Sequence, residues 1–291
     1  MNLVNIHESS SILRDTRVNR MEAYKLKIVS LRRYPVKSMM GEELNACELT
    51  SRGVFGDRMY GVIDEETGKL ANAKNPKKWP TMFQHRSTYV RPISISKGIA
   101  PVQIALPNGE YIKSDEHLVD DVLSESFNRK VSLRTPSADT VEFEGYVPKE
   151  IEELEDRGTV FSRESPTDTF FDIAMIHIIT TNTINTLRKL IPESRIEPRR
   201  FRPNIIIDVP EKEGFVEEEW VGKTIHIGEG VSLRIIQPTK RCVMTTLAQG
   251  DLPNDINVLK TLVKENNGHF GVYAEVKQEG HIKVGDTITV K

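Results

Sequence analysis

A single cysteine among charged residues is the group in this sequence best suited to chemistry. Cys242 lies in the stretch Q-P-T-K-R-C-V-M-T-T-L, directly after Lys240 and Arg241. Positive charge favours the thiolate form, and a thiolate can act as a nucleophile or as a ligand of a soft metal ion. Because free cysteines are most often buried packing residues, the local sequence alone favours a structural role for Cys242.

Three further segments place polar or cationic residues where predicted strands end or begin. Y-P-V-K-S carries Lys37 and Ser38 after a proline-terminated strand, and F-G-D-R-M-Y carries Arg58 in a glycine-led turn. R-R-F-R-P-N places Arg202 at the start of another strand. Loops at strand ends commonly form sites, and several cations that face one cleft would bind an anionic ligand. Taken alone, each of these charges would be interpreted as a solvated surface group.

The other reactive residue types indicate packing rather than chemistry. Cys47 lies within a predicted strand and His177 alternates with apolar residues, so both are expected in the core. We expect Arg199 and Arg200, which stand just before Arg202 in the sequence, to be surface charges. The two cysteines of the chain are too few for a zinc site made of cysteines or for a four-cysteine iron–sulfur cluster.

Composition places the 291-residue chain among ordinary globular proteins. Apolar residues make up 38% and charged residues 28%, with a net charge of −2, so neither nucleic acid nor an anionic membrane is an expected partner. No apolar run is long enough to span a bilayer, and the first residues lack the apolar segment of a secretion signal. We therefore expect a cytoplasmic protein.

Short strands separated by glycine- and proline-containing turns dominate the first half of the sequence. One helix is predicted at 116–127, where Leu118, Val122, Leu123 and Phe127 have helical spacing. This pattern predicts a β-rich barrel or sandwich. The predicted strands are 25–34, 44–49, 59–63, 69–73, 102–106, 111–113 and 131–133.

The second half mixes strands with two helices. A buried strand at 173–179 precedes a helix that Thr180, Thr181 or Thr183 can cap, and 258–263 is also helical. The predicted strands that follow are 204–209, 223–227, 231–236, 270–277 and 287–290. Between the halves, the acidic and weakly periodic stretch 136–166 predicts a linker. The expected division is a disordered or leader tail at 1–23, an N-terminal domain at 24–135, that linker, and a second domain at 167–291.

Several motifs in a fixed order resemble a known family. Y-P-V-K-S, G-D-R-M-Y, F-R-P-N-I-I-I, R-C, H-F-G-V-Y and K-V-G-D follow one another along the chain. Together they resemble the MOSC family, named for the C-terminal domain of molybdenum cofactor sulfurases. The two-part members, with an N-terminal MOSC β-barrel domain, are the most similar, among them the mitochondrial amidoxime-reducing component and its bacterial relatives. The resemblance spans about 24–290 and implies a mainly β fold, α+β overall, with a β-barrel MOSC domain that carries a few helices.

The resemblance also implies roles for individual residues. Cys242 matches the cysteine that ligates molybdenum. Molybdopterin carries a phosphate and a dithiolene, so a group of cations suits it. Lys240 stands where relatives carry a small polar residue, although it keeps positive charge near the anion, and the choice among threonines 180–183 stays open. The implied contacts of the molybdenum cofactor (Mo-molybdopterin) are Lys37, Ser38, Arg58, Thr180, Thr181, Arg202, Lys240, Arg241 and Tyr273.

The function implied by the resemblance is that of a molybdenum-dependent oxidoreductase, independent of pyridoxal phosphate, that reduces small N-hydroxylated compounds. Molybdenum would supply the two-electron chemistry, and the protein would supply position and electrostatics. Because the chain lacks cluster cysteines, electrons would come from a separate carrier such as a flavodoxin, a ferredoxin or a b-type cytochrome. The alternative is a binding protein that carries the cofactor or a sulfur atom without turnover.

Overall fold

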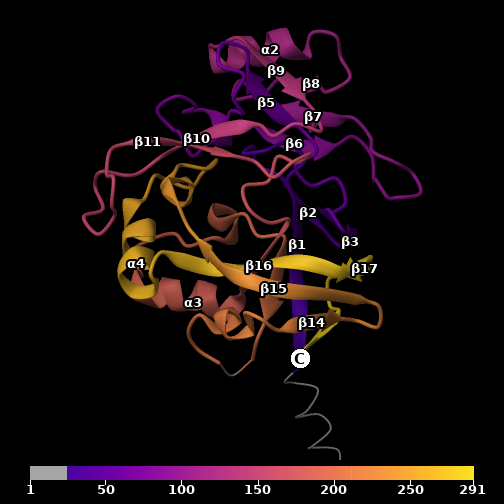
Figure 1. The fold of residues 1–291 in the computed structure, drawn as a ribbon, viewed down its shortest axis with the longest axis vertical. Helices are drawn as coiled ribbons and strands as arrows, with labels where there is room; N and C mark the ends of the chain where they lie inside the picture. The colour runs from indigo at the N-terminus through magenta and orange to yellow at the C-terminus, as the bar shows by residue number, and fades with distance from the viewer. Residues whose placement is uncertain (1–24, 211) are drawn as a thin grey trace, which may run out of the picture.

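The computed structural model describes residues 25–210 and 212–291, so the expected tail at 1–23 lies outside the described residues. Strands predominate, and three α-helices occur in the described ranges, which confirms the predicted mainly β fold. Two bodies are stacked along the long axis (Figure 1). We call residues 59–165 the upper body, and residues 25–33, 42–54 and 173–291 the barrel body.

Seven strands close the barrel. Neighbouring strands are antiparallel, except that β12 and β13 are parallel. A short strand, β2 (Glu42–Leu44), extends the sheet beyond β1. In order around the barrel, the seven are β1 (Leu26–Arg33), β13 (Ile205–Asp208), β12 (Ile176–Thr180), β16 (His269–Gln278), β15 (Val231–Lys240), β14 (Thr224–Ile227) and β18 (Thr287–Val290).

The first strand of the chain belongs to the barrel of the second half. β1 pairs with both β13 and β18, and its inward residues Ile28 and Leu31 lie opposite Ile207 and Ile205. These apolar side chains are fully buried in the barrel core, and this burial stabilises the closure. The first strand of the chain therefore completes a barrel whose other six strands come from the second half of the chain.

A small sheet lies beside the barrel. Its order is β17 (Gly280–Lys283), β3 (Ala46–Thr50) and β4 (Gly53–Val54), so it joins early and late parts of the chain. Cys47 lies in β3 and is buried in the barrel core, in agreement with the expected packing role.

The upper body contains three small sheets and one helix, and two of the sheets surround its own apolar core together with the helix. Val62, Met82, Ile104 and Leu123 are buried there without measurable exposure. Its elements are β5 (Gly61–Asp64), η1 (Met82–Gln84), β6 (Arg86–Tyr89), β7 (Val102–Ala105), β8 (Tyr111–Lys113), α2 (Val119–Phe127) and β9 (Val131–Arg134).

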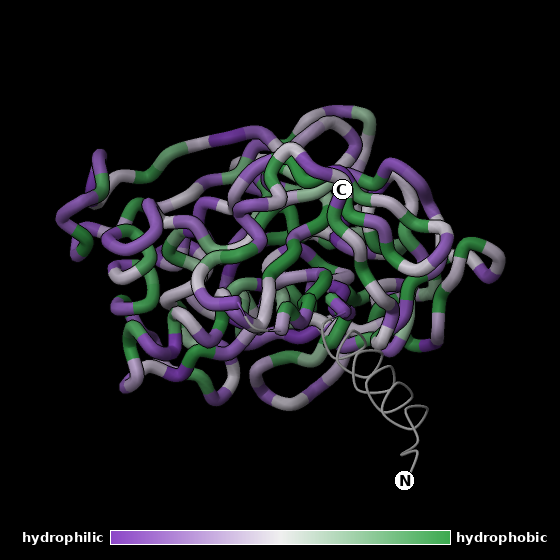
Figure 2. The backbone as a smooth tube through the Cα atoms, turned by 90° about the horizontal axis from the view of Figure 1, so that it is seen from below, coloured by the Kyte–Doolittle hydropathy of each residue, from purple (hydrophilic) through white to green (hydrophobic). Residues whose placement is uncertain are grey.

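The acidic stretch expected to be a linker contains a hairpin. β10 (Glu142–Tyr146) pairs with β11 (Val160–Glu164), and Phe143 is fully buried between Leu70 and Phe170. β11 is exposed along nearly its whole length, so it lacks the alternating apolar pattern that identifies a strand in a sequence. Figure 2 shows hydrophilic residues along the outer loops and apolar residues concentrated within the molecule.

Two helices cover one side of the barrel. α3 (Thr181–Leu190) begins where the Thr180 side chain accepts a hydrogen bond from the Thr183 backbone, as the sequence predicted. α4 (Ile256–Asn266) shares an apolar cluster with it. Three short 3₁₀ turns complete this body: η2 (Pro198–Phe201), η3 (Val216–Trp220) and η4 (Val243–Thr246). Within the described ranges, no helix has the length and apolar character that a membrane crossing requires.

Candidate functional site

Asp172 joins two lysines at the junction of the two bodies. Its Oδ1 accepts a hydrogen bond of 2.6 Å from Lys37 Nζ, and its Oδ2 lies 2.9 Å from Lys74 Nζ. Lys37 Nζ also donates to the Phe170 carbonyl at 2.6 Å. Both ammonium groups lie over the ring of Phe143, at 5.0 and 4.6 Å from its centroid. One carboxylate thus serves two cations, which leaves positive charge in excess.

The three charges shift one another's pKa values. Burial lowers the pKa of Lys37 to about 8, although Asp172 opposes this effect. Burial of Asp172 would raise its pKa, but the two ammonium groups outweigh burial and hold it well below its usual range. Burial opposes the charge of Lys74 as well, yet Asp172 and Cys242 outweigh it and raise its pKa. The carboxylate and Lys74 are therefore charged at neutral pH.

Cys242 lies beside this group. It follows β15, forms the N-cap of η4, and is a free, partly exposed thiol. Tyr273 lies in β16, opposite His177 of β12. Burial raises the pKa of Tyr273, and the charges that act on it include those of Arg241, Lys74 and Cys242. The thiol, the phenol and these cations are thus neighbours.

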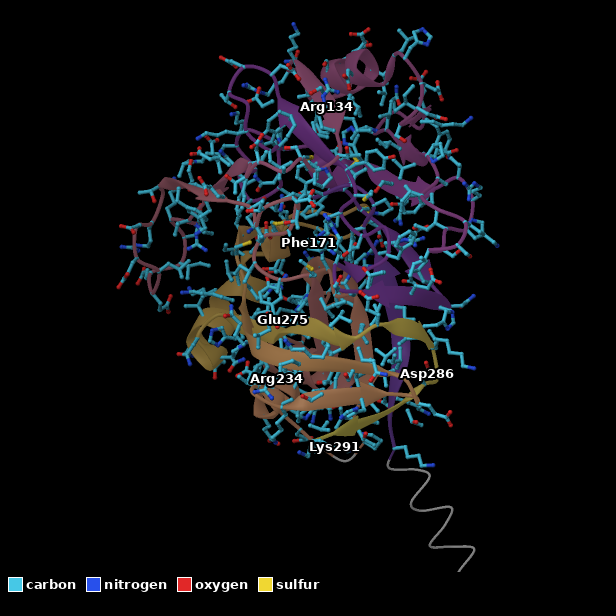
Figure 3. All side chains as sticks on the ribbon, turned by 45° about the vertical axis from the view of Figure 1, so that its right-hand side comes forward. Arg134, Phe171, Arg234, Glu275, Asp286 and Lys291 are labelled. Carbon is cyan, nitrogen blue, oxygen red and sulfur yellow. The ribbon has the colours of Figure 1, made fainter. Side chains whose placement is uncertain are left out.

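Two arginines are stacked on Tyr34. The guanidinium carbons of Arg58 and Arg202 lie 4.8 and 4.0 Å from its ring centroid. Burial and repulsion from Arg58 lower the pKa of Arg202 to about 10. Arg58 also lies 5.3 Å from the ring centroid of Phe171, which Figure 3 shows where the two bodies meet. Two like charges are therefore held close together, an arrangement that a bound anion would stabilise.

The backbone is in the left-handed region at three predicted site residues. The φ angles are 63° at Ser38, 48° at Arg58 and 54° at Arg202. Non-glycine residues are uncommon there, and such conformations are concentrated at binding sites. The Arg58 backbone N–H donates to the Tyr34 carbonyl at 2.9 Å, which helps to hold its turn.

A buried polar pair supports this turn. Asp57 accepts hydrogen bonds from the Tyr34 backbone at 2.7 Å and from Asn204 Nδ2 at 2.8 Å, and it forms an ion pair with Arg58. Asn204 Oδ1 in turn accepts from the His177 backbone at 3.1 Å. These bonds fix the start of β13 against the turn that carries Arg58.

We call the five cations of this region, Lys37, Arg58, Lys74, Arg202 and Arg241, the cation cradle. Two carboxylates, Asp57 and Asp172, face them, so positive charge exceeds negative charge by three. Two buried donors, Arg202 Nη2 and Arg241 Nε, have no hydrogen-bond partner within the described part of the chain. Buried donors normally have partners, so the cradle suits a multiply charged anion.

His177 is a core residue, in agreement with expectation. It is buried, and its ring nitrogens face the carbonyls of Arg202 at 3.4 Å and Phe270 at 3.2 Å. Burial and the charge of Arg241 lower its pKa to about 3. The ring is therefore neutral and supports the strands beneath the site.

Three predicted contacts are not brought to the cradle. Thr180 Oγ1 donates to Glu217 at 2.7 Å and Thr181 Oγ1 donates to Asp208 at 2.8 Å. Thr180 is the last residue of β12 and Thr181 is the first residue of α3, so both lie beyond the position at which His177 pairs with Tyr273. Lys240 is exposed at the end of β15. The structure brings together the remaining predicted residues: Lys37, Ser38, Arg58, Arg202, Arg241, Cys242 and Tyr273.

Lys74 and Asp172 were missed by sequence reasoning. Lys74 lies in N-A-K-N-P-K-K, directly after a predicted strand, and Asp172 directly precedes one. The rule that selected Lys37 and Arg58, polar residues at strand ends, applies equally to both. Asp172 was missed because a carboxylate does not fit a search for anion-binding groups, and Lys74 was missed because nothing in the sequence distinguishes it from the nearby Lys77 and Lys78.

Arg200 is not the surface charge that we expected. It is fully buried, and its guanidinium donates to the carbonyls of Arg195 at 3.0 Å, Leu247 at 3.2 Å and Pro253 at 2.9 Å. It therefore ties the segment after Cys242 to η2, and so helps to fix the position of the thiol.

The chain matches two family models of known proteins. Residues 25–120 match the family model described as the MOSC N-terminal beta barrel domain, and residues 167–289 match the one described as the MOSC domain. The YuaD protein from Bacillus subtilis is 15% identical, with 91% of this chain and 95% of that chain covered and a TM-score of 0.46. YiiM from Geobacillus stearothermophilus is 15% identical, with 55% and 67% covered and a TM-score of 0.32. No curated protein matches the chain at a significant level.

Proposed function

This chain belongs to the MOSC family in its two-part form, and we propose that it binds the molybdenum cofactor in the cation cradle, with Cys242 as a ligand of the metal. The observation that carries the proposal is the excess of buried positive charge beside a free thiol. A phosphate and a dithiolene need cations and hydrogen-bond donors, and a thiolate is a suitable ligand for a soft metal.

The residues present fit this cofactor. Arg202 Nη2 and Arg241 Nε are buried donors without partners in the described part of the chain, and a bound anion is the kind of group that would accept their hydrogen bonds. Lys37 and Lys74 are held by Asp172, so their charges are already in place before a ligand arrives. Such preorganisation strengthens binding because little ordering is left to occur.

We propose further that the protein is an oxidoreductase that reduces N-hydroxylated compounds. An amidoxime, two electrons and two protons would give an amidine and water, and a separate carrier protein such as a flavodoxin, ferredoxin or b-type cytochrome would supply the electrons. When bound, molybdenum would supply the two-electron chemistry. The chain's own residues would hold the cofactor and keep Cys242 accessible, because that side chain is partly exposed.

Metal analysis tests the binding proposal. Protein purified from cells that make molybdopterin should contain about one molybdenum atom per chain, and Cys242→Ser should lose most of it. Cys47→Ser is the matched control, because the Cys47 thiol is buried in the barrel core away from the cradle. Full metal content in Cys242→Ser would overturn the ligand assignment.

Turnover tests the reaction. Chemically reduced, metal-loaded protein should convert benzamidoxime to benzamidine. The partial exposure of Cys242 also favours a second candidate function, that of a cofactor or sulfur carrier, because a carrier must present its thiol to a partner. Full molybdenum content without any conversion, or a persulfide on Cys242 in the purified protein, would favour the carrier.

A further inference from the structure

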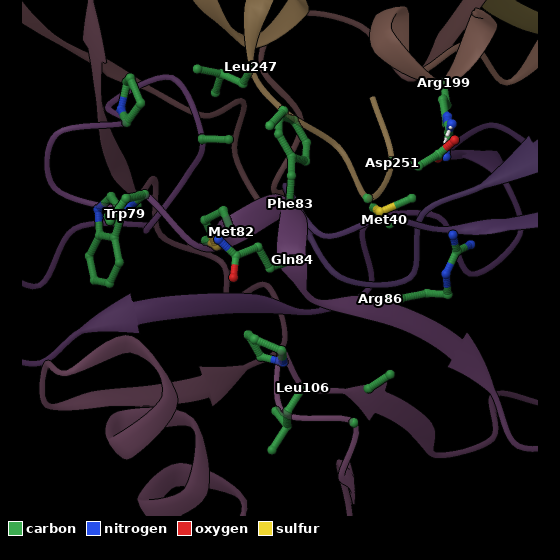
Figure 4. A pocket seen from close by; sticks show the side chains of 18 of the residues that line it. Met40, Trp79, Met82, Phe83, Gln84, Arg86, Leu106, Arg199, Leu247 and Asp251 are labelled. Carbon is green, nitrogen blue, oxygen red and sulfur yellow. Dashed lines mark hydrogen bonds and ion pairs between the residues drawn. The ribbon is translucent and has the colours of Figure 1, made fainter. Parts of the chain in front are cut away.

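A large pocket lies between the two bodies, and none of its lining residues belongs to the cation cradle. Its volume is about 980 Å³, within the range of small-molecule sites. Its walls come from η1 and β6 to β8 of the upper body, and from Arg199 and the segment 247–254 of the barrel body (Figure 4). Pockets between two such bodies are common places for ligands.

One part of the lining is apolar and rigid. Trp79, Met82 and Phe83 are buried side chains of the upper body, and Leu106 and Leu247 complete this wall. Three lining prolines restrict the backbone around it: Pro76, Pro80 and Pro107. A flat, apolar group could therefore bind here with little rearrangement.

The opposite side carries a cation without a counter-ion. The guanidinium of Arg86 is exposed and donates from Nη1 to the Gly41 carbonyl at 2.8 Å, and no carboxylate lies within 4.0 Å of it in the described ranges. Arg199, by contrast, pairs with Asp251 at 2.5 Å and with Glu197 at 2.8 Å. Figure 4 shows Arg86 across the pocket from Trp79, so charge and apolar surface are at opposite sides.

We propose that this pocket binds a small amphipathic anion, whose flat apolar body packs against Trp79, Phe83 and Leu106 and whose carboxylate or sulfonate pairs with Arg86. The ligand would be distinct from the cofactor. One short turn links the pocket to the candidate site, because Leu247, which lines the pocket, is the C-cap of η4 and Cys242 is its N-cap.

The probe is 1-anilinonaphthalene-8-sulfonate, titrated into the folded, cofactor-free full chain and followed by fluorescence. We expect saturable binding of one probe per chain. Arg86→Gln should weaken it about tenfold, the typical loss for one charge-assisted hydrogen bond. Arg91→Gln is the matched control, because Arg91 is an exposed arginine that does not line the pocket, and its affinity should equal that of the wild type.

Two further measurements test whether the probe binds in this pocket and whether binding requires a negative charge on the ligand. Ala105→Trp, which fills the lining with a large side chain, should abolish binding while melting temperature and circular dichroism show a folded protein. 2-Naphthoate should compete at least tenfold better than neutral 2-naphthol. Equal competition, or unchanged binding in Arg86→Gln, would overturn the proposal. So would loss of binding in Arg58→Gln, because the probe would then be bound in the cradle.

Discussion

Lys37 Nζ and Asp172 Oδ1 lie 2.6 Å apart, although 135 positions separate the two residues in the chain. This ion pair connects the segment after β1 to the segment before β12 at the junction of the two bodies. Asp172 also pairs with Lys74 of the upper body, so one carboxylate holds both halves of the site together. The same group that assembles the cradle thus reduces its charge by one unit.

Replacement of Asp172 should therefore be costly for folding. Asp172→Asn would leave two enclosed ammonium groups without their counter-ion. Breaking a fully buried pair costs about 3–5 kcal/mol, and because the Asp172 side chain is 30% exposed, we expect about 2–3 kcal/mol. Urea unfolding measures the loss. Asp168→Asn, which breaks an exposed pair with Arg52, should cost less than about 1 kcal/mol. Equal losses in both variants would contradict the prediction.

Acid should destabilise the protein through His177. Its folded-state pKa of about 3 lies below the unfolded value near 6.5, so the neutral ring stabilises the fold above pH 6.5 and this contribution is lost as pH falls. Between pH 6.5 and 5 the wild type should lose about 2 kcal/mol on this account. His177→Gln cannot titrate there and should show a smaller loss in urea unfolding at the two pH values. Parallel pH profiles would show that another group is responsible.

Titration of Glu217 should change stability with pH in the opposite direction to that of His177. Burial raises its pKa, although hydrogen bonds from Thr183 and Thr180 oppose the shift. The protonated carboxyl is thus favoured in the fold, and stability is lost as pH rises through the range between the unfolded and folded values. The melting temperature of Glu217→Gln, relative to that of the wild type, should be higher at pH 8 than at pH 4.5. A higher relative melting temperature of the variant at pH 4.5 would contradict the raised pKa of Glu217.

Gly271 is required by the close approach of two strands. Its φ is +85°, and a Cβ atom there would lie 2.5 Å from His177 Nε2 and 2.6 Å from the Ile178 carbonyl. Gly271→Ala should therefore cost more than about 3 kcal/mol, since neither neighbour can move freely. Gly285 has a φ of +93° and no atom within 4 Å of a Cβ built there. Gly285→Ala should therefore lose only about 1–2 kcal/mol, from the unfavourable backbone conformation. Similar losses in thermal unfolding would show that crowding at Gly271 is unimportant.

Arg200 should stabilise the segment that follows the thiol. Arg200→Met would remove a buried guanidinium that donates to three partly buried carbonyls, and we expect a loss of about 2–3 kcal/mol in urea unfolding. Cys242 should also react faster with iodoacetamide at fixed pH, because η4 would open more often. Arg195→Gln, an exposed neighbour, should change neither value appreciably. If Arg200→Met behaved like Arg195→Gln, the buried bonds would have no positioning effect.

Most strand positions were predictable because local pattern determines them, whereas the grouping of Lys37, Arg58, Arg202 and Arg241 was expected only from the family resemblance. The cap of the helix after Thr180 and the turns of the hairpins depend only on residues that are close together in the sequence. The expected packing roles of Cys47 and His177 also agree with the structure, since each alternates with apolar residues along its strand.

What escaped prediction depends on contacts between distant segments. β1 joins the barrel only through pairing with β13 and β18, and β11 carries no apolar alternation. The residues next to Arg200 in the sequence predict a solvated side chain. Its burial results from contacts with the carbonyls of the segment 245–253. Thr180 and Thr181 lie at and just after the end of the strand that carries His177, but their hydroxyls donate to Glu217 and Asp208 and not to residues of the cation cradle.

The closure of the barrel by β1 has a consequence during synthesis. Ile28 and Leu31 leave the ribosome early, whereas β18 is made roughly 260 residues later, and at about 5–20 residues per second the interval is on the order of 10–50 s. β2 and β13 are made earlier and can pair with β1, but the barrel cannot close on its β18 side until the end of this interval. The nascent chain therefore passes through a stage in which chaperone binding competes with aggregation, and we expect its yield to depend on translation speed more than the stability of the finished barrel would suggest.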